Sequence, residues 1–297
     1  MQGTDGFRVE GFFEKNGVNE KISCKWAEGK KEIYANDIIY EKPSDHIGKY
    51  ASVIIAPDDI ELINGASEQR RKWVDSILGQ TDMLYLENLL TYQKVLLQRN
   101  AWLKQQNTAP SIDRAALDFY NEKLVETGNY IHQKRAEFID LFLPVLQKLY
   151  TQLCNGKEQV QIIYETDLSE KKLAAWLESS FQQDIRLQRT SRGLHKDDWD
   201  FILNTSVLKN FASQGQKKSF LFALKLAQYE YLRTHHHNNP ILLLDDIFEK
   251  LDQKRAEALF QMIQHPDFGQ VLLTDTHIER VKIAFGDKNS IDFINLQ

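Results

Sequence analysis

The chain has 297 residues, 42% of them hydrophobic and 27% charged, which is the composition of a soluble globular protein with one large domain or two ordinary ones. Its net charge of −5 excludes a surface that is basic throughout, so any binding to nucleic acid needs a local basic patch. No apolar run approaches the roughly 18 residues of a membrane span or forms a signal peptide, and Cys24 and Cys154 lack zinc-binding spacing, so we expect a cytoplasmic protein with free thiols.

Residues 7–56 alternate between apolar and polar side chains as strands do, and Asn-Gly, Glu-Gly and Pro-Ser pairs divide them into short segments. This pattern predicts a small β-meander. The strand-like sequence begins within a few residues of Met1, as it would if the chain entered the middle of a sheet.

The pattern becomes helical over residues 67–148, where apolar residues recur at helical spacing between Arg, Lys, Gln and Glu. A Thr-Ala-Pro sequence at residues 108–110 interrupts it. We therefore predict a helical hairpin with arms at about 84–106 and 111–152.

The remaining sequence alternates between strands and helices. Two short strands, at 160–165 and 185–190, are predicted on either side of a helix at 168–181. The C-terminal third predicts a helix, a strand, a helix and a strand, at 213–234, 241–244, 253–265 and 270–273. This alternation points to a parallel sheet in an α/β fold.

The segment PILLLDDIFEKLD at Pro240–Asp252 is the most specific part of the chain. Its branched apolar residues predict a buried parallel strand that ends at Asp245 and Asp246. Ligands bind at the carboxyl ends of such strands, where one Asp can hold Mg²⁺ in nucleotide hydrolases and a second acid can orient or deprotonate the attacking water. Taken alone, the same letters also fit a strand followed by an acidic turn.

The segment FASQGQKKSF predicts a helix start capped by Ser213, whose free backbone N–H groups and partial positive charge suit an anion. Lys217 and Lys218 either extend that positive field or form a solvated helix face. A second apolar strand, VLLT, is followed by His277, which could sense a γ-phosphate or lie on the surface.

Together these segments resemble the ATP-binding-cassette type of ATPase that includes the SMC, Rad50 and RecF proteins. SQGQ is similar to the signature motif of that class, ILLLDD to Walker B, EKLD to the D-loop and TDTH to the switch region. The segments at Ile54–Asp75, Tyr85–Lys104 and Gly193–Phe201 narrow the resemblance to the RecF family, because they occur in family order and extend it over nearly the whole chain.

The resemblance implies a role for each matching residue. Asp245 matches the Mg²⁺-associated Walker B acid, and Asp246 matches the acid that helps to position the attacking water. His277 matches the switch position, where RecF sequences vary.

The signature residues have an implied role between subunits. Ser213, Gln214, Gly215 and Gln216 match the motif that closes over the γ-phosphate of an ATP bound to the other subunit, and Asp252 matches the D-loop acid at that dimer interface. The motif HKDD, which lies just upstream, is expected to shape the nucleotide interface.

The fold implied by the resemblance is an α/β ABC-type ATPase head with an inserted helical arm. We expect three regions: 1–66 as the rest of a β-rich N-terminal lobe, 67–190 as the arm, and 191–297 as the C-terminal lobe with the signature, Walker B and switch motifs. The head combines the N-terminal β region with the C-terminal parallel sheet.

The implied function is that of an ATP- and Mg²⁺-dependent clamp in DNA replication, recombinational repair and the SOS response to DNA damage. It would form an ATP-dependent homodimer near the nucleoid. There it would act with RecR and RecO at gapped or single-stranded DNA to load the recombinase RecA. An SMC head fits less well, because its two halves are separated by hundreds of heptad residues.

A phosphate-binding Walker A loop, G-x-x-x-x-G-K-[ST], does not occur in the sequence. In the family this loop precedes the meander, so we expect it upstream of Met1 in the complete protein. As given, the chain is expected to bind ATP poorly or not at all. The alternative function is therefore an ATPase-defective RecF-like fragment that serves only as a DNA-binding or scaffold module.

Basic residues form local clusters that could neutralise DNA phosphates or belong to ordinary solvated faces. The candidates for DNA contact lie in three segments of the chain: Arg70, Arg71 and Lys72, then Arg99, then Arg186, Arg189, Arg192 and Lys196.

Overall fold

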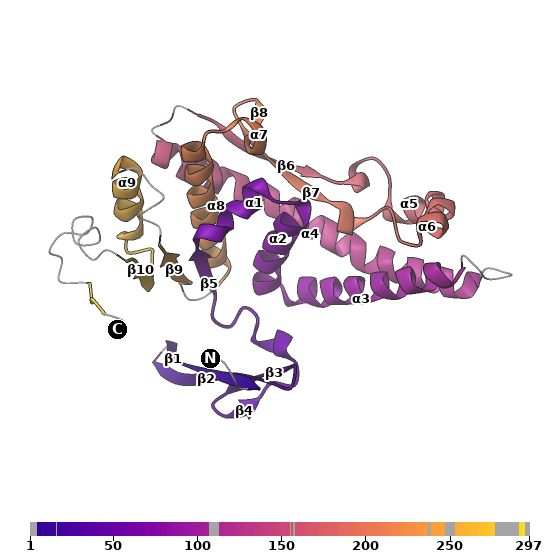
Figure 1. The fold of residues 1–297 in the computed structure, drawn as a ribbon, viewed down its shortest axis with the longest axis horizontal. Helices are drawn as coiled ribbons and strands as arrows, with labels where there is room; N and C mark the ends of the chain where they lie inside the picture. Colours follow the sequence, from indigo (N-terminus) through magenta and orange to yellow (C-terminus); the bar gives the residue numbers. More distant parts are fainter. Residues whose placement is uncertain are drawn as a thin grey trace.

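The computed structural model describes residues 5–15, 17–106, 113–154, 156, 158–236, 239–246, 253–276 and 291–294. Figure 1 shows a helical arm that extends to one side of a head built from helices and short strands, with a separate small sheet below the head.

The small sheet is an antiparallel meander of β1 (Gly6–Lys15), β2 (Val18–Ala27), β3 (Lys30–Ala35) and β4 (Ile38–Ile39). Its two faces differ, because alternate residues point to opposite sides. Phe7 pairs with Trp26 on an apolar face, whereas the other face holds the ion pair of Arg8 with Glu10. This part of the predicted meander is confirmed.

The last strand that we predicted for the meander belongs elsewhere. β5 (Ser52–Ile55) lies in a parallel sheet of order β10-β9-β5 with β9 (Ile241–Asp245) and β10 (Val271–Thr274). Val53 and Ile55 are buried there beside Leu242 and Leu244. The prediction that residues 51–56 close the meander is therefore wrong, because a longer-range pairing buries this apolar strand.

Two helices complete this part of the head. α8 (Gln214–His235) leads into β9, and α9 (Gln253–Ile263) lies between β9 and β10 in the chain. The prediction of a parallel α/β arrangement in the C-terminal third is confirmed.

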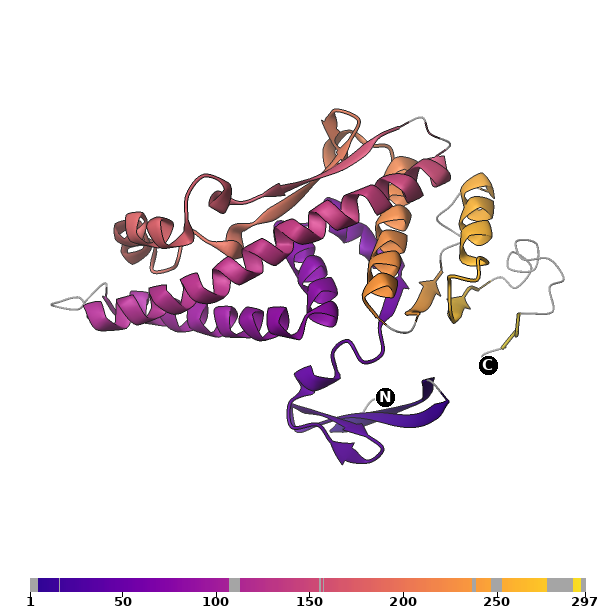
Figure 2. The same cartoon turned by 180° about the vertical axis from the view of Figure 1, so that it is seen from behind.

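The arm is the predicted hairpin, formed by α3 (Met83–Gln106) and α4 (Arg114–Cys154), which run side by side in both ribbon views (Figures 1 and 2). η2 (Pro57–Ile60), α1 (Glu61–Asn64) and α2 (Ser67–Thr81) connect β5 to the arm. The lone η1 (Pro43–His46) connects the meander to β5.

The third sheet is antiparallel and contains β6 (Val160–Glu165), β7 (Asp198–Leu203) and β8 (Ser206–Val207). η3 (Asp167–Ser169), α5 (Leu173–Ser179), α6 (Phe181–Leu187) and η4 (Leu194–Lys196) lie between β6 and β7, and α7 (Leu208–Phe211) follows β8. Because β6 pairs with β7, this sheet spans the boundary that we predicted at residue 190.

The predicted strand at 185–190 is wrong, since residues 181–187 form α6. The helix is held by its environment: Phe181 packs on Trp102 of the arm, and the buried Asp184 accepts a hydrogen bond from Arg99. The predicted single helix at 168–181 is likewise replaced by η3 and α5.

An aromatic core joins the arm to the head. Trp73 of α2 makes edge contacts with Phe138 and Phe142 of α4 and with Phe201 of β7, and Tyr231 of α8 packs on Phe138. Within the part of the chain that the structure describes, no helix has the length and apolar character needed to cross a membrane.

Candidate nucleotide site at the strand ends

The two predicted acids at the end of β9 differ in exposure and in backbone conformation. Asp245 is exposed, and its Oδ1 accepts a hydrogen bond of 2.6 Å from the Thr274 hydroxyl at the end of β10. Asp246 is half-buried in a left-handed backbone conformation with φ of 48°. Its Oδ1 is buried and has no hydrogen-bond partner among the described residues. A buried carboxylate oxygen of this kind costs stability unless a ligand, an ion or water satisfies it.

The start of α8 has the predicted capping box. Ser213 Oγ accepts from the Gln216 N–H at 3.3 Å, and Gln216 Oε1 accepts from the Ser213 N–H at 2.7 Å. The Lys217 N–H reaches the Ser213 carbonyl. Helix geometry leaves the first N–H groups, those of Gln214 and Gly215, without an acceptor inside the helix. These two groups and the helix dipole form an anion-binding element.

A cavity of about 330 Å³ lies between the two elements. It is lined by residues from the ends of β5 and β9 and from the first turns of α8: Ile55, Ala56, Pro57, Ile60, Gln214, Lys218, Leu221, Phe222, Asp245 and Asp246. One chain therefore places a cation, two carboxylates and a helix N-terminus around one space.

The cavity also includes residues that the sequence did not indicate. Ile55, Ala56 and Pro57 line it because β5 pairs in parallel with β9, so both strands end at the same edge of the sheet. The apolar run at 51–56 is the signal that the sequence offers, but its alternation does not show which sheet it joins. Lys218 lines the cavity, whereas Lys217 does not.

Lys217 is buried and serves the protein itself. Its Nζ donates to Asn64 Oδ1 at 3.0 Å and to the Lys209 carbonyl at 2.7 Å. Its charge is therefore committed to α1 and α7, and the expectation that it belongs to a ligand-facing or solvated field is corrected.

The donor set fits Mg²⁺. No group of three or more His, Cys, Asp and Glu side chains that could hold a metal occurs among the residues that the structure describes. Mg²⁺ does not need such a cage, since it keeps several waters and is held by one or two carboxylates and substrate phosphates. Asp245 and Asp246 would supply these carboxylates at the strand end.

His277 and Asp252, the predicted switch and D-loop residues, lie outside the described residues. The predicted roles of both stay predictions.

Two of the predicted DNA contacts are corrected. The Arg99 side chain has no exposed area and bonds with Asp184 and Thr190, so it cannot reach a DNA phosphate in this structure. Arg70 is buried and forms a two-pronged ion pair with Asp198. Sequence clustering could not distinguish these structural arginines from surface ones.

The other basic candidates are more accessible. Arg71 is half-buried and donates to the Asp197 carbonyl, and Arg192 pairs with Asp167 at 2.9 Å. The exposed candidates are Lys72, Arg186, Arg189 and Lys196. Of these, Lys72 pairs with Glu68 on its own helix.

The HKDD motif lies in a buried polar network next to the arm. Asp197 accepts from Arg135 Nη1 at 2.8 Å, and a second acid, Asp75, accepts from Arg135 Nη2 at 2.9 Å. Burial raises the pKa of Asp197 although Arg135 opposes that rise. Burial also lowers the pKa of His195 to about 4, so this imidazole is neutral at pH 7. The Arg135 ion pairs hold α2, α4 and the residue that precedes β7 together.

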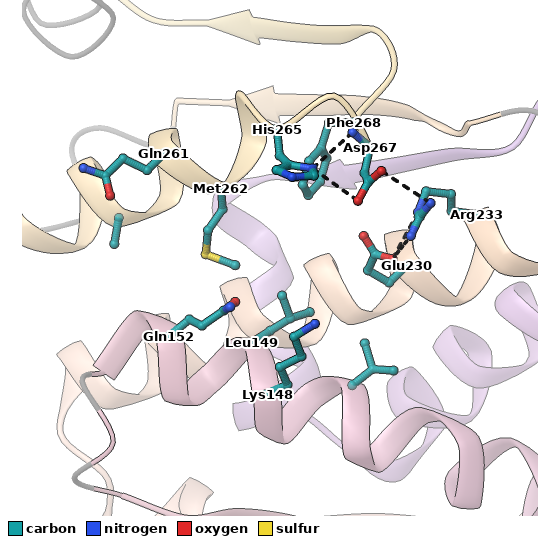
Figure 3. Close-up of a pocket in the computed structure, with 12 residues that line it drawn as sticks. Lys148, Leu149, Gln152, Glu230, Arg233, Gln261, Met262, His265, Asp267 and Phe268 are labelled. Carbon is teal, nitrogen blue, oxygen red and sulfur yellow. Dashed lines mark hydrogen bonds and ion pairs between the residues drawn. The ribbon is translucent and has the colours of Figure 1, made fainter.

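A second cavity, of about 550 Å³, lies between α4, α8 and α9 (Figure 3). Arg233 pairs with Glu230 at 2.8 Å at its edge, and His265 lies 3.2 Å from Asp267. None of the predicted site residues lines this cavity.

Comparisons with known proteins place the chain among named relatives. No protein-family model matches it. It is 43% identical over 281 residues to the "DNA replication and repair protein RecF" of Flavobacterium johnsoniae, an alignment that covers 94% of this chain and 78% of the relative. The protein of the same name from Cytophaga hutchinsonii is 39% identical over 287 residues, covering 97% and 76%.

Solved structures give the same result for the fold. A structure of the "recombination mediator protein RecF-ATP in RecFOR pathway" matches with a TM-score of 0.83 at 26% identity, over 93% of this chain and 76% of that one. The corresponding RecF-ATPrS structure matches with a TM-score of 0.82 at 27% identity.

Proposed function

The chain belongs to the RecF family, and from this premise we propose that it binds ATP and DNA in replication-linked recombinational repair. The observation that carries the proposal is the cavity in which Asp245, Asp246, Lys218 and the start of α8 meet. The acids would hold the magnesium ion of an ATP on this chain, and the free helix N–H groups would receive the γ-phosphate of an ATP on a second chain packed against the same cavity.

Each residue has a definite task in this proposal. Asp245, oriented by the Thr274 hydroxyl, would hold Mg²⁺, which when bound neutralises phosphate charge. The free Oδ1 of Asp246 would accept a proton or a hydrogen bond from the attacking water. The signature residues Ser213–Gln216 would bind the γ-phosphate of an ATP held by a second subunit.

ATP would thus act as a clamp that couples head-to-tail dimerisation to DNA binding. Lys72, Arg186, Arg189 and Lys196 have the exposure that phosphate contact requires. The partners would be RecR and RecO at gapped or single-stranded DNA, where the complex would help to load RecA. His277 and Asp252 would complete the switch and the dimer interface, and the protein would act in the cytoplasm near the nucleoid.

A second candidate function follows from one feature of the sequence. Its Gly-Lys pairs, at residues 29, 48 and 156, are not followed by Ser or Thr, so these 297 residues contain no Walker A loop. On this reading the chain binds DNA or acts as a scaffold without turning over ATP.

Equilibrium binding of a fluorescent ATP analogue and of gapped DNA, with and without Mg²⁺, tests the proposal. ATP binding that strengthens DNA binding, and that is weakened by Asp246→Asn, is the expected result. DNA binding that is unchanged by saturating ATP supports the scaffold function instead.

A further inference from the structure

α3 has an apolar stripe on its solvent-exposed side, in addition to the face that packs against α4. Met83, Leu90 and Leu97 are 46%, 48% and 71% exposed, whereas Tyr85 and Tyr92 of the same helix are buried. Residues seven apart lie nearly above one another on a helix, so the three exposed side chains form one line. In both ribbon views α3 forms the outer edge of the arm (Figures 1 and 2).

Charged and small residues complete the line at alternating spacings of four and three. They are Glu87, Lys94, Ala101 and Lys104, and all four are exposed. Within the described chain, Glu87, Lys94 and Lys104 take part in no ion pair, although several other helix charges do. The stripe from residue 83 to residue 104 therefore has the residue spacing of a helix-pairing seam, and its charged side chains form no ion pair within the described chain.

The order of charged and apolar residues along the stripe is complementary to the same stripe of a second copy that runs antiparallel to it. A two-fold axis between residues 95 and 96 brings Glu87 opposite Lys104 of a second copy, Leu90 opposite Ala101, and Lys94 opposite Leu97. The axis forms each contact twice, along a seam of about 26 Å. A parallel pairing in register would place Glu87 against Glu87 and Lys94 against Lys94, which is repulsive.

We propose that this stripe is a self-association surface, on which α3 of a second copy of the chain packs antiparallel. Leu90 and Leu97 bury apolar area against Ala101 and the aliphatic stem of Lys94, and the two Glu87–Lys104 pairs set the direction and the register. The stripe itself has two cations and one anion, a balance that suits a matching protein helix better than a nucleic acid.

This contact is distinct from the head-to-tail dimer of the proposed function. It uses the arm, needs no nucleotide, and is small enough to give a weak and reversible dimer. The head-to-tail dimer is also two-fold symmetric, because each signature faces the ATP of the other subunit. Two different isologous contacts on one chain join copies into a row. Neighbouring heads on DNA would then be held together by their arms.

Sedimentation equilibrium of the full chain without nucleotide, over a range of concentrations, measures the contact directly. We expect a monomer–dimer equilibrium that Glu87→Lys and Lys104→Glu each weaken at least tenfold, and that the double variant restores. Lys148→Glu on α4, an exposed site with the same charge change, is the matched control and leaves the equilibrium unchanged.

A second pair of variants, both at Leu97, distinguishes the loss of apolar contact from charge repulsion. Leu97→Lys places a cation opposite Lys94 and should abolish the dimer, whereas Leu97→Glu places an anion there and should retain part of it. Circular dichroism verifies that every variant is folded. A wild-type chain that stays monomeric, charge reversals that act no more than Lys148→Glu, or a double variant that fails to recover overturns the proposal.

Discussion

Lys225 Nζ lies 2.7 Å from Asp59 Oδ1, in an ion pair of a buried lysine with a half-buried carboxylate that fixes the middle of α8 to the η2 turn after β5. Burial lowers the pKa of Lys225, and the carboxylate of Asp59 opposes that effect. Lys217 contacts Asn64 on the same side of α8, and Gln228 accepts from Trp73 Nε1 at 2.9 Å. Two walls of the candidate site, the start of α8 and the end of β5, are therefore held as one unit.

Removing one partner of this ion pair should be costly, because it leaves the other charge at a largely water-excluded position without its counter-charge. We expect Lys225→Met to lower the free energy of unfolding by about 3 kcal/mol. Asp59→Asn should cost less, since an amide oxygen can still accept from the Ala56 N–H that Asp59 Oδ2 binds at 2.8 Å. Urea unfolding of both single variants and of the double variant gives the coupling; additive effects would show that the pair is energetically unimportant.

Position 213 can separate the helix cap from the anion site. Ser213→Ala removes the capping oxygen and should cost about 1 kcal/mol of stability. Ser213→Asp keeps a capping oxygen and should leave stability within about 0.5 kcal/mol, but its negative charge should repel phosphate. Thermal unfolding and ATP-analogue binding, measured on both variants, check this. Equal nucleotide binding by Ser213→Asp and the wild type would contradict the anion role.

The native Asp246 should make the protein less stable than a glycine at the same position would. Its left-handed φ of 48° is strained for a residue with a Cβ, and its Oδ1 is buried without a partner among the described residues. We expect Asp246→Gly to raise the free energy of unfolding by about 1 kcal/mol and to abolish any stimulation of turnover by Mg²⁺. Chemical denaturation and phosphate release are the measurements. A destabilised glycine variant would mean that the carboxylate has a structural partner.

Acid should destabilise the protein through His195. Its folded pKa of about 4 lies below the ordinary 6.5, so between these values the unfolded chain binds more protons than the native one. Stability therefore falls as the pH drops through this window, by on the order of 3 kcal/mol in total. Lys196 and Arg71 disfavour the charged imidazole, whereas Asp184 and the Thr190 carbonyl favour it.

A His195→Gln variant isolates that contribution, because Asp197 and the other titrating groups are common to both proteins. Its amide can still donate to the Thr190 carbonyl, which His195 Nε2 contacts at 3.0 Å. Urea unfolding from pH 4 to pH 7 should show a slope that is smaller by about one proton. Parallel curves for the two proteins would mean that His195 titrates normally.

Features set by local chemistry could be predicted from the sequence. The cap at Ser213 depends on a side chain and a backbone three residues away, and the hairpin of α3 and α4 follows from periodicity. β7 could have been predicted too, since the buried Trp199, Phe201 and Leu203 alternate with half-buried residues, two of which are aspartates. In these regions one short window holds the deciding information.

Features set by distant partners could not be predicted. The sequence of β5 alternates as the sequences of the meander strands do. Only its pairing with β9 shows that the end of β5 belongs to the site. Residues 185–190 have strand-like letters, but Asp184 and Phe181 are held by Arg99 and Trp102 of the arm. Arginine clusters likewise do not reveal which members, such as Arg70, are buried.

The central claim is that Ser213 and Asp246 complete a nucleotide site between two chains. An equimolar mixture of Ser213→Arg and Asp246→Asn chains tests it most directly, through ATP-dependent retention of gapped DNA in the presence of Mg²⁺. Each variant alone should fail, and the mixture should recover part of the wild-type retention, because a hybrid dimer contains one intact site. A mixture as inactive as its components, or a Ser213→Arg chain that retains DNA as the wild type does, would contradict the claim.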